Sequence, residues 1–423
     1  MQETPAQAAG ATEAEPGRPR RPFGTKETLI VAFACGTTTM SFNVWYPFMP
    51  LYVLKLGATS DANALFWVAV ATAVQGVGRL LTGPVWGVFS DRFGRKVMLL
   101  RALYLSTMSF AVMAIITAPW QVAIALGLQG VFSGHQPPSV ALVSVSVPDS
   151  KINTALGYLS GATYIGSTVG PALGAGLAIA LGYRGAILGA SLIPLVAATL
   201  VLFFVPSDEV GGLKTETQTT RPQLEPFRLT YQFLLCIFLF FVIYAVGQLI
   251  RFATPIALRA IEGDKDVAGI AGLTFTLGGL ASAFSVLVLA PRFFRVGRLR
   301  LGVAAGCVLA AVGFVFIAFA GSTAVYVVGF IIVSLIVSAL VPTTNTLVAA
   351  NVPRSRRGTG FGVVGSAQAM GFTVGPAAAA LFAAISLEAG FALVAVFLVG
   401  LAALIVITLR EPNLDGGEIH SRV

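Results

Sequence analysis

The stretch that decides the fold lies between two long apolar segments and reads Gly87-Val-Phe-Ser-Asp91-Arg92-Phe-Gly94-Arg95-Lys96. Each kind of residue in this run has its own physical use. Gly87 permits a neighbouring helix to approach, Asp91 can cap a helix or pair with an arginine, and Gly94 permits a tight turn. The basic residues alone could be plain membrane-surface anchors. An acid at fixed spacing among them favours a specialised loop.

The segments around this loop require a membrane. Hydrophobic residues make up 56% of the 423 positions and charged residues 11%, whereas soluble domains contain roughly 25% charged residues. Apolar runs long enough to cross a hydrocarbon core of about 30 Å recur along the whole chain. A membrane β-barrel would instead need segments of about ten residues that alternate in polarity. The sequence therefore predicts an all-α membrane protein.

Charged, polar and Gly/Pro clusters divide the chain into twelve expected transmembrane helices in two bundles of six. A polar linker over 206–229 separates an N-terminal bundle at 27–205 from a C-terminal bundle at 230–410, with disordered cytoplasmic tails at 1–26 and 411–423. The helices are expected at 27–56, 62–89, 97–117, 120–146, 153–181, 185–205, 230–259, 266–290, 300–320, 323–349, 358–384 and 387–409.

Positive charge sets the orientation. Of the 27 Lys and Arg residues, 21 fall in the tails, the linker and the loops on the same side, four fall on the other side, and two fall inside spans. The positive-inside rule then predicts cytoplasmic termini and a multi-pass protein of the plasma (inner) membrane. The net charge of +9 is a loop property, so it requires no nucleic-acid partner.

Cysteine spacing and the first apolar run exclude two other features. Cys35, Cys236 and Cys307 all lie in apolar spans without metal-ligand spacing, so they are expected to be buried, and no metal or cofactor is expected. The first apolar run has no small-residue cleavage site after it, so we expect it to remain as a helix.

The two bundles are related by an internal repeat of 205 residues. This shift aligns two glycine patterns, one in the fifth helix and one in the eleventh, which consist of Gly157, Gly166, Gly170, Pro171 and Gly174, and of Gly362, Gly371, Gly375 and Pro376. Small residues permit close helix contact and proline bends a helix, so we expect these faces to form the seam between the bundles. The alternative is ordinary helix packing.

With these motifs the chain resembles the major facilitator superfamily over about residues 27 to 410, and within it the twelve-helix drug/proton antiporter branch. The resemblance implies two pseudo-symmetric six-helix bundles, a loop at 87–96 that locks the cytoplasmic side, and a glycine motif in the fifth helix typical of exporters. It also implies that the first, fourth, seventh and tenth helices line a central cavity.

The sequence departs from that family pattern at two positions. Leu126 stands where those exporters usually have an arginine, three residues before Gln129-Gly130, which places the usual route of proton coupling in doubt. In the second bundle, Phe294 stands where the loop would have its acid.

Three ionisable residues lie at membrane depth, where charge is costly and usually functional. Arg251 of the seventh helix is expected near the substrate or, alternatively, snorkelling to the outer surface. Arg79 of the second helix is expected to tie helices together. His135 could relay protons or could satisfy a carbonyl group. Polar and aromatic lining is expected from Asn43, Trp45, Tyr46, Gln248 and Asn345.

These features predict a secondary active exporter of small organic molecules, either drugs or metabolites, that is coupled to protons, works by alternating access and needs no partner chain. None of the 18 acids falls deep in a span, which favours neutral, amphiphilic or anionic substrates. Uptake of a metabolite on the same fold, or a non-transporting receptor, are the alternatives. No phosphate-binding motif of an ATP-driven pump occurs and no enzymatic chemistry is indicated.

Overall fold

The computed structural model describes residues 23–132, 134–148, 151–207, 230–263, 266–294, 298–352 and 357–411. The first helix begins at Thr25, inside the segment expected as the N-terminal tail, but most of the expected tails and of the linker lies outside these ranges. Within them every regular element is helical, and the helices in chain order are α1 (Thr25–Trp45), η1 (Tyr46–Phe48), α2 (Met49–Lys55), α3 (Asp61–Phe93), α4 (Arg95–Ile115), α5 (Pro119–Phe132), α6 (Gln136–Ser146), α7 (Ile152–Phe204), α8 (Tyr231–Glu262), α9 (Val267–Phe284), η3 (Ser285–Leu289), α10 (Ala290–Phe293), α11 (Leu299–Ala318), α12 (Thr323–Asn351), α13 (Arg357–Ile385) and α14 (Leu387–Thr408).

Ten stretches in the described part are long and apolar enough to span a membrane. Two local features account for the difference from the expected twelve. The stretch labelled α7 contains two passes, because Gly182 at φ 69° and ψ 172° is not helical and turns the chain back between two helices. The expected helix at 120–146 is instead two shorter helices, α5 and α6, because Pro137 and Pro138 remove backbone donors at its centre. With both features counted, the described residues make twelve passes.

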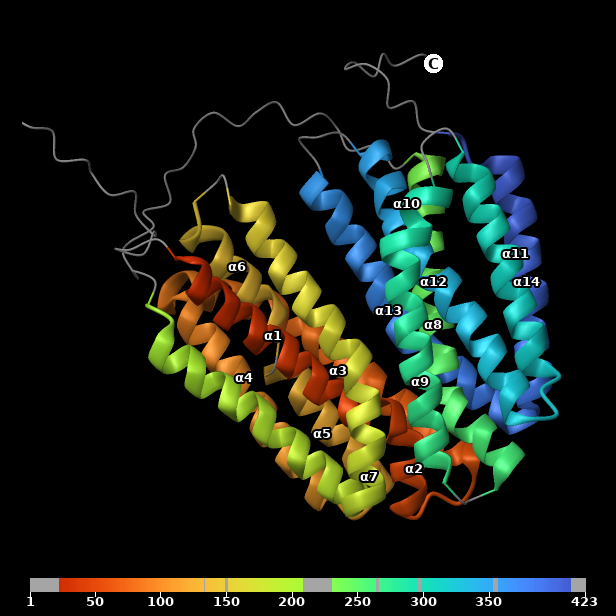
Figure 1. Cartoon of the computed structure of the whole chain (residues 1–423), viewed down its shortest axis with the longest axis horizontal. Helices are drawn as coiled ribbons and strands as arrows, with labels where there is room; N and C mark the ends of the chain where they lie inside the picture. Colours follow the sequence, from red (N-terminus) through yellow and green to blue (C-terminus); the bar gives the residue numbers. More distant parts are fainter. Residues whose placement is uncertain are drawn as a thin grey trace, which may run out of the picture.

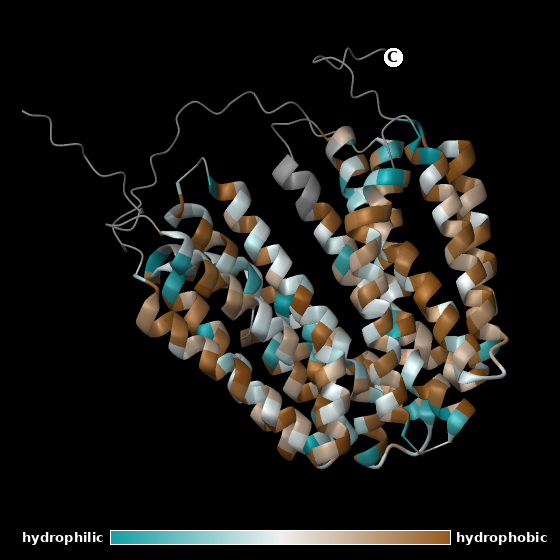
Figure 2. Cartoon of the chain, viewed as in Figure 1, coloured by the Kyte–Doolittle hydropathy of each residue, from teal (hydrophilic) through white to brown (hydrophobic). Residues whose placement is uncertain are grey.

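The helices form two bundles, α1–α7 and α8–α14, which lean apart toward one end (Figure 1). We call this the linker end, because Phe204 and Tyr231 lie there, and we call the end with Lys55, Gly182 and Glu262 the far end. Figure 2 shows hydrophilic residues mainly near the helix ends and hydrophobic ones along the middle stretches. This distribution suits a bilayer between the two ends.

The bundles contact each other toward the far end. Aromatic rings meet across the interface there, with ring centroids of Phe48 and Phe275 5.9 Å apart. Gly272 of α9 packs so closely on Ala175 of α7 that a β-carbon would overlap with it.

At the linker end the same helices are separate. A β-carbon added at any of five glycines there would have no neighbour within 4 Å in the described part of the chain; these are Gly83, Gly87, Gly157, Gly161 and Gly365. The described contacts between the bundles thus lie toward the far end, whereas the bundles lean apart at the linker end (Figure 1).

The repeated glycines pack helices inside each bundle. Gly166 of α7 lies on the backbone of Gly36 in α1, and Gly371 of α13 lies on that of Phe241 in α8. Gly36 and Phe241 are themselves 205 residues apart, so the repeat is reproduced contact by contact. The expectation that these glycines form the seam between bundles is therefore wrong. The seam on α7 uses an adjacent face, with Thr168 and Ala175 against α9.

Candidate functional site between the two bundles

A hydrogen bond joins the bundles at the level of the membrane interior. The Arg251 Nη1 atom of α8 donates to Asn43 Oδ1 of α1 over 2.8 Å. The Asn43 amide in turn donates to the Thr39 carbonyl oxygen over 2.8 Å, and its Cβ packs where Gly170 leaves room. Asn43 is thus held in one orientation, and its side-chain oxygen fixes the position of the Arg251 guanidinium. Arg251 points toward α1, which contradicts the alternative that it snorkels outward.

A cluster of aromatic rings lies beside this pair. The Tyr46 ring lies between Phe42 at 4.2 Å and Phe252 of the other bundle at 5.0 Å, measured between centroids. Trp45 belongs to the same cluster, with its ring centroid 5.8 Å from that of Phe42 and 5.9 Å from that of Tyr46. It is buried within the N-terminal bundle against Phe110 of α4, at a centroid distance of 5.8 Å.

His135 lies at the break between α5 and α6. Its Nε2 atom is 3.1 Å from the Thr39 hydroxyl of α1, one turn before Asn43. Its carbonyl oxygen accepts from Ser139 Oγ over 2.7 Å. The proline pair that breaks the helix thereby places the His135 imidazole against α1. This break was not predicted from the sequence.

Arg79 does not tie helices together as expected. It makes no hydrogen bond or ion pair among the described residues, and its side chain is exposed. One turn earlier on α3, Gln75 bonds to Gln129 of α5 and Gly76 faces Thr373 of α13. Arg79 therefore points between α5 and α13, and it lies within electrostatic range of Tyr46 and His135. This direction adds Arg79 to the site.

Two other expected lining residues have different surroundings. Gln248 of α8 is buried beside Gly375 of α13. This contact is the repeat equivalent of the contact between Asn43 and Gly170. Its side-chain oxygen has no donor in the described part of the chain. Asn345 is half-buried on α12, and none of the described contacts connects it to the arginines.

The loop at 87–96 adopts the expected turn. Gly94 has φ 94°, so it ends α3, and α4 begins at Arg95. Lys96 Nζ donates to the Leu202 carbonyl oxygen over 2.9 Å, which anchors α4 to the last turn of α7 within the same bundle. Arg92 lies over the Phe93 ring at 5.5 Å. The side chain of Asp91 lies outside the described part, so its pairing stays a prediction.

In the second bundle, the loop has Phe294 where an acid would be expected, and a residue distant in the sequence supplies a carboxylate. Glu411 caps α11, accepting from Leu299 N over 3.1 Å and from Arg300 N over 2.7 Å. A carboxylate stabilises a helix N-terminus there, although Phe294 replaces the acid of the loop itself. Because Glu411 follows the last helix, no local pattern pointed to this cap.

An ion pair joins the bundles at the far end. Arg259 Nη1 of α8 lies 2.5 Å from Asp61 Oδ1 at the start of α3. The two residues are far apart in the sequence, and no local pattern pairs them. Together with the aromatic contacts, this pair holds the far end closed.

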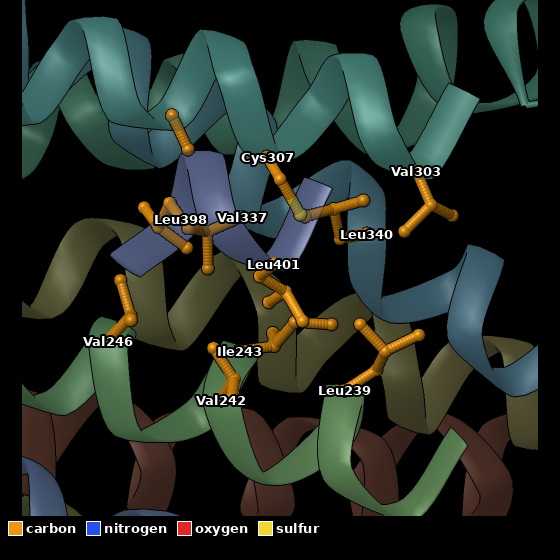
Figure 3. Close-up of a pocket in the computed structure, with 11 residues that line it drawn as sticks. Leu239, Val242, Ile243, Val246, Val303, Cys307, Val337, Leu340, Leu398 and Leu401 are labelled. Atoms are coloured by element: carbon orange, nitrogen blue, oxygen red, sulfur yellow. The ribbon is translucent and has the colours of Figure 1, made fainter. Parts of the chain in front are cut away.

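An apolar pocket lies elsewhere, inside the C-terminal bundle (Figure 3). Its lining comes from α8, α11, α12 and α14 and includes Leu239, Cys307 and Leu401. No polar side chain lines it, so it has no group to orient a ligand. Cys307, like Cys35 and Cys236, is a buried free thiol as predicted.

Two helical bundles with a polar site between them define a membrane transporter, and the sequence comparisons name the family. The profile of the Major Facilitator Superfamily matches residues 28–290 and 237–420. The chain therefore belongs to this superfamily.

Relatives place the chain near multidrug efflux proteins. It is 31% identical over 288 residues to multidrug resistance protein MdtG of Proteus mirabilis (strain HI4320). This alignment covers 67% of this chain and 70% of the relative. It is 30% identical over 282 residues to the multi-drug resistance efflux pump PmrA of Streptococcus pneumoniae, in an alignment that covers 66% of this chain and 70% of the relative.

Solved structures share the fold. A bacterial homologue of the human lysosomal transporter Spinster, inward-facing and unoccupied, superposes with a TM-score of 0.71 at 13% identity, over 90% of this chain and 96% of that one. The human organic anion transporter MFSD10 (TETRAN) gives a TM-score of 0.63 at 19% identity, over 91% and 99%.

Proposed function

We propose that this protein exports small organic molecules across the inner membrane by alternating access, with its termini in the cytoplasm. One observation carries the proposal: a polar site lies between two bundles that are closed at the far end and separate at the linker end. Transporters of this type rock one half against the other around such a site. The names of the relatives support export over the alternative of metabolite uptake.

We further propose that proton entry drives export. His135 is the residue of the site whose side chain, an imidazole with an unperturbed pKa of about 6.5, can take up and release a proton. Its contact with Thr39 connects it to the helix that holds Asn43. Leu126 at the usual arginine position means that this route would differ from that of related exporters.

Accumulation of dyes in efflux-deficient cells tests the proposal. Carboxyfluorescein, Nile red and ethidium provide an anion, a neutral compound and a cation. We expect lower accumulation of at least one dye in cells with the protein, and a protonophore should abolish the difference. Higher accumulation would indicate uptake, and an unchanged level for a broad panel, with the protein present in the membrane, would refute drug export.

The ion pair at the far end provides a test of alternating access. Asp61→Asn should favour opening of the far end up to about fivefold, because a pair whose side chains are 31% and 37% exposed contributes only about 0.2–1 kcal/mol. Spin labels on cysteines at Thr59 and Ala260, in a chain whose native cysteines are replaced, should report a larger share of long distances.

The reciprocal charge exchange is the matched test. Asp61→Arg combined with Arg259→Asp should return the distances toward those of the wild type. Glu388→Gln removes another exposed far-end acid and should change nothing. Equal shifts from Glu388→Gln and Asp61→Asn would show that the ion pair has no specific role.

A further inference from the structure

Two arginines from opposite bundles face one central region. Arg251 reaches from α8 to Asn43, and Arg79 points from α3 between α5 and α13. Both lie within electrostatic range of the same hydroxyl group, that of Tyr46. Charges at membrane depth are costly, and they are normally paired with each other or with an opposite charge.

Among the side chains that the structure describes, no carboxylate is available to pair with them. The described acids all lie near helix ends, and they are Glu27, Asp61, Glu262, Asp266, Glu388 and Glu411. The backbone at position 91 is twelve residues further along α3 than Arg79, or about 18 Å at the helical rise. Within the described part of the chain, the two guanidinium groups therefore have no acidic partner.

The donors of these arginines remain largely unused. A guanidinium has five N–H donors in a planar fork that matches an oxyanion. Arg251 uses one of them on Asn43, and its side chain is only half-buried. Arg79 uses none among the described residues and is exposed. Both groups thus keep unused donors and some exposed side-chain surface.

We propose that Arg79 and Arg251 together bind the oxyanion group of the substrate, so that the exported compounds are amphiphilic organic anions. The aromatic rings of Phe42, Tyr46 and Phe252 take the apolar part beside the charge. The inference rests on the proposed function and narrows its substrate class. An anion held by one arginine of each bundle also removes the repulsion between them, which permits the linker end to close.

The experiment compares transport and binding in the same variants. Arg79→Gln and Arg251→Gln each remove one positive charge, and Arg79→Lys and Arg251→Lys keep the charge but lose the fork. Arg184→Gln is the matched control, because Arg184 donates to the Ile116 carbonyl oxygen at the far end, outside the site. Export of carboxyfluorescein and of Nile red is measured in cells. Thermal stabilisation of the purified protein by benzoate and by phenylphosphonate is measured separately.

We expect each glutamine variant to lower carboxyfluorescein export and anion binding about tenfold or more, as loss of a charged hydrogen bond predicts. Export of any neutral dye should persist, which shows that the variant is folded. A response to benzoate, to phenylphosphonate or to both identifies the oxyanion that the site accepts.

Two results would overturn the inference: anion binding that survives in both glutamine variants, or stabilisation of the wild type by neither anion. The binding measurement stands even if no dye is exported from cells, which would refute the proposed function alone. Export of only neutral or cationic dyes, without anion binding, would leave export established and refute the anion site.

Discussion

Gly174→Ala should lower the yield and thermal stability of the folded protein more than any other single methyl group added to α7. A β-carbon at Gly174 would overlap with the Val44 carbonyl oxygen of α1, which is backbone and cannot rotate away. Overpacking of this kind costs about 1–3 kcal/mol and sometimes more. Thermal unfolding followed by size-exclusion chromatography measures the loss.

Gly176→Ala is the matched control for this prediction. It lies on the same helix two residues later, and a β-carbon there would meet no atom of the described chain within 4 Å. Alanine also has the higher helix propensity, so this variant should be as stable as the wild type or slightly more stable. If both variants unfolded at the same temperature, close α1–α7 packing would not be what requires Gly174.

The sequence predicts the fold well because length and hydrophobicity are local properties. The expected spans over 62–89 and 230–259, for example, correspond to α3 and α8 with differences of a few residues at their ends. The repeat also predicted which glycines are equivalent. It could not show which face of α7 packs on which helix, because a glycine pattern specifies close contact and leaves the partner undetermined.

The site was predicted only in part. Asn43, Tyr46, His135 and Arg251 could be found as polar or aromatic residues within spans. Arg79 was assigned a structural role, because its direction depends on how α3 packs against both bundles. The Arg259–Asp61 pair joins residues 198 positions apart and depends on the conformation of the whole protein. Such contacts have no local signature.

Gly272→Ala should shift the protein toward conformations in which the far end is open. A β-carbon at Gly272 of α9 would overlap with the Ala175 side chain of α7, so the two bundles must separate there. The bundles themselves should stay folded, because this contact lies between them. An overpacking cost of about 1–3 kcal/mol corresponds to a population change of roughly five- to a hundredfold. Distances between spin labels at Thr59 and Ala260 measure it.

A second substitution makes this prediction specific. Ala175→Gly removes the atom that the new methyl group would meet, and the next atoms, Ala175 Cα and Pro171 O, lie 3.5 Å away. The double variant should therefore recover the closed far end and the wild-type transport rate, while Ala175→Gly alone should change the distances little. If the double variant stayed as open as Gly272→Ala alone, the shift would come from a changed α9 and not from crowding at the seam. Recovery would show that small residues on α7 and α9 set the balance between the two ends.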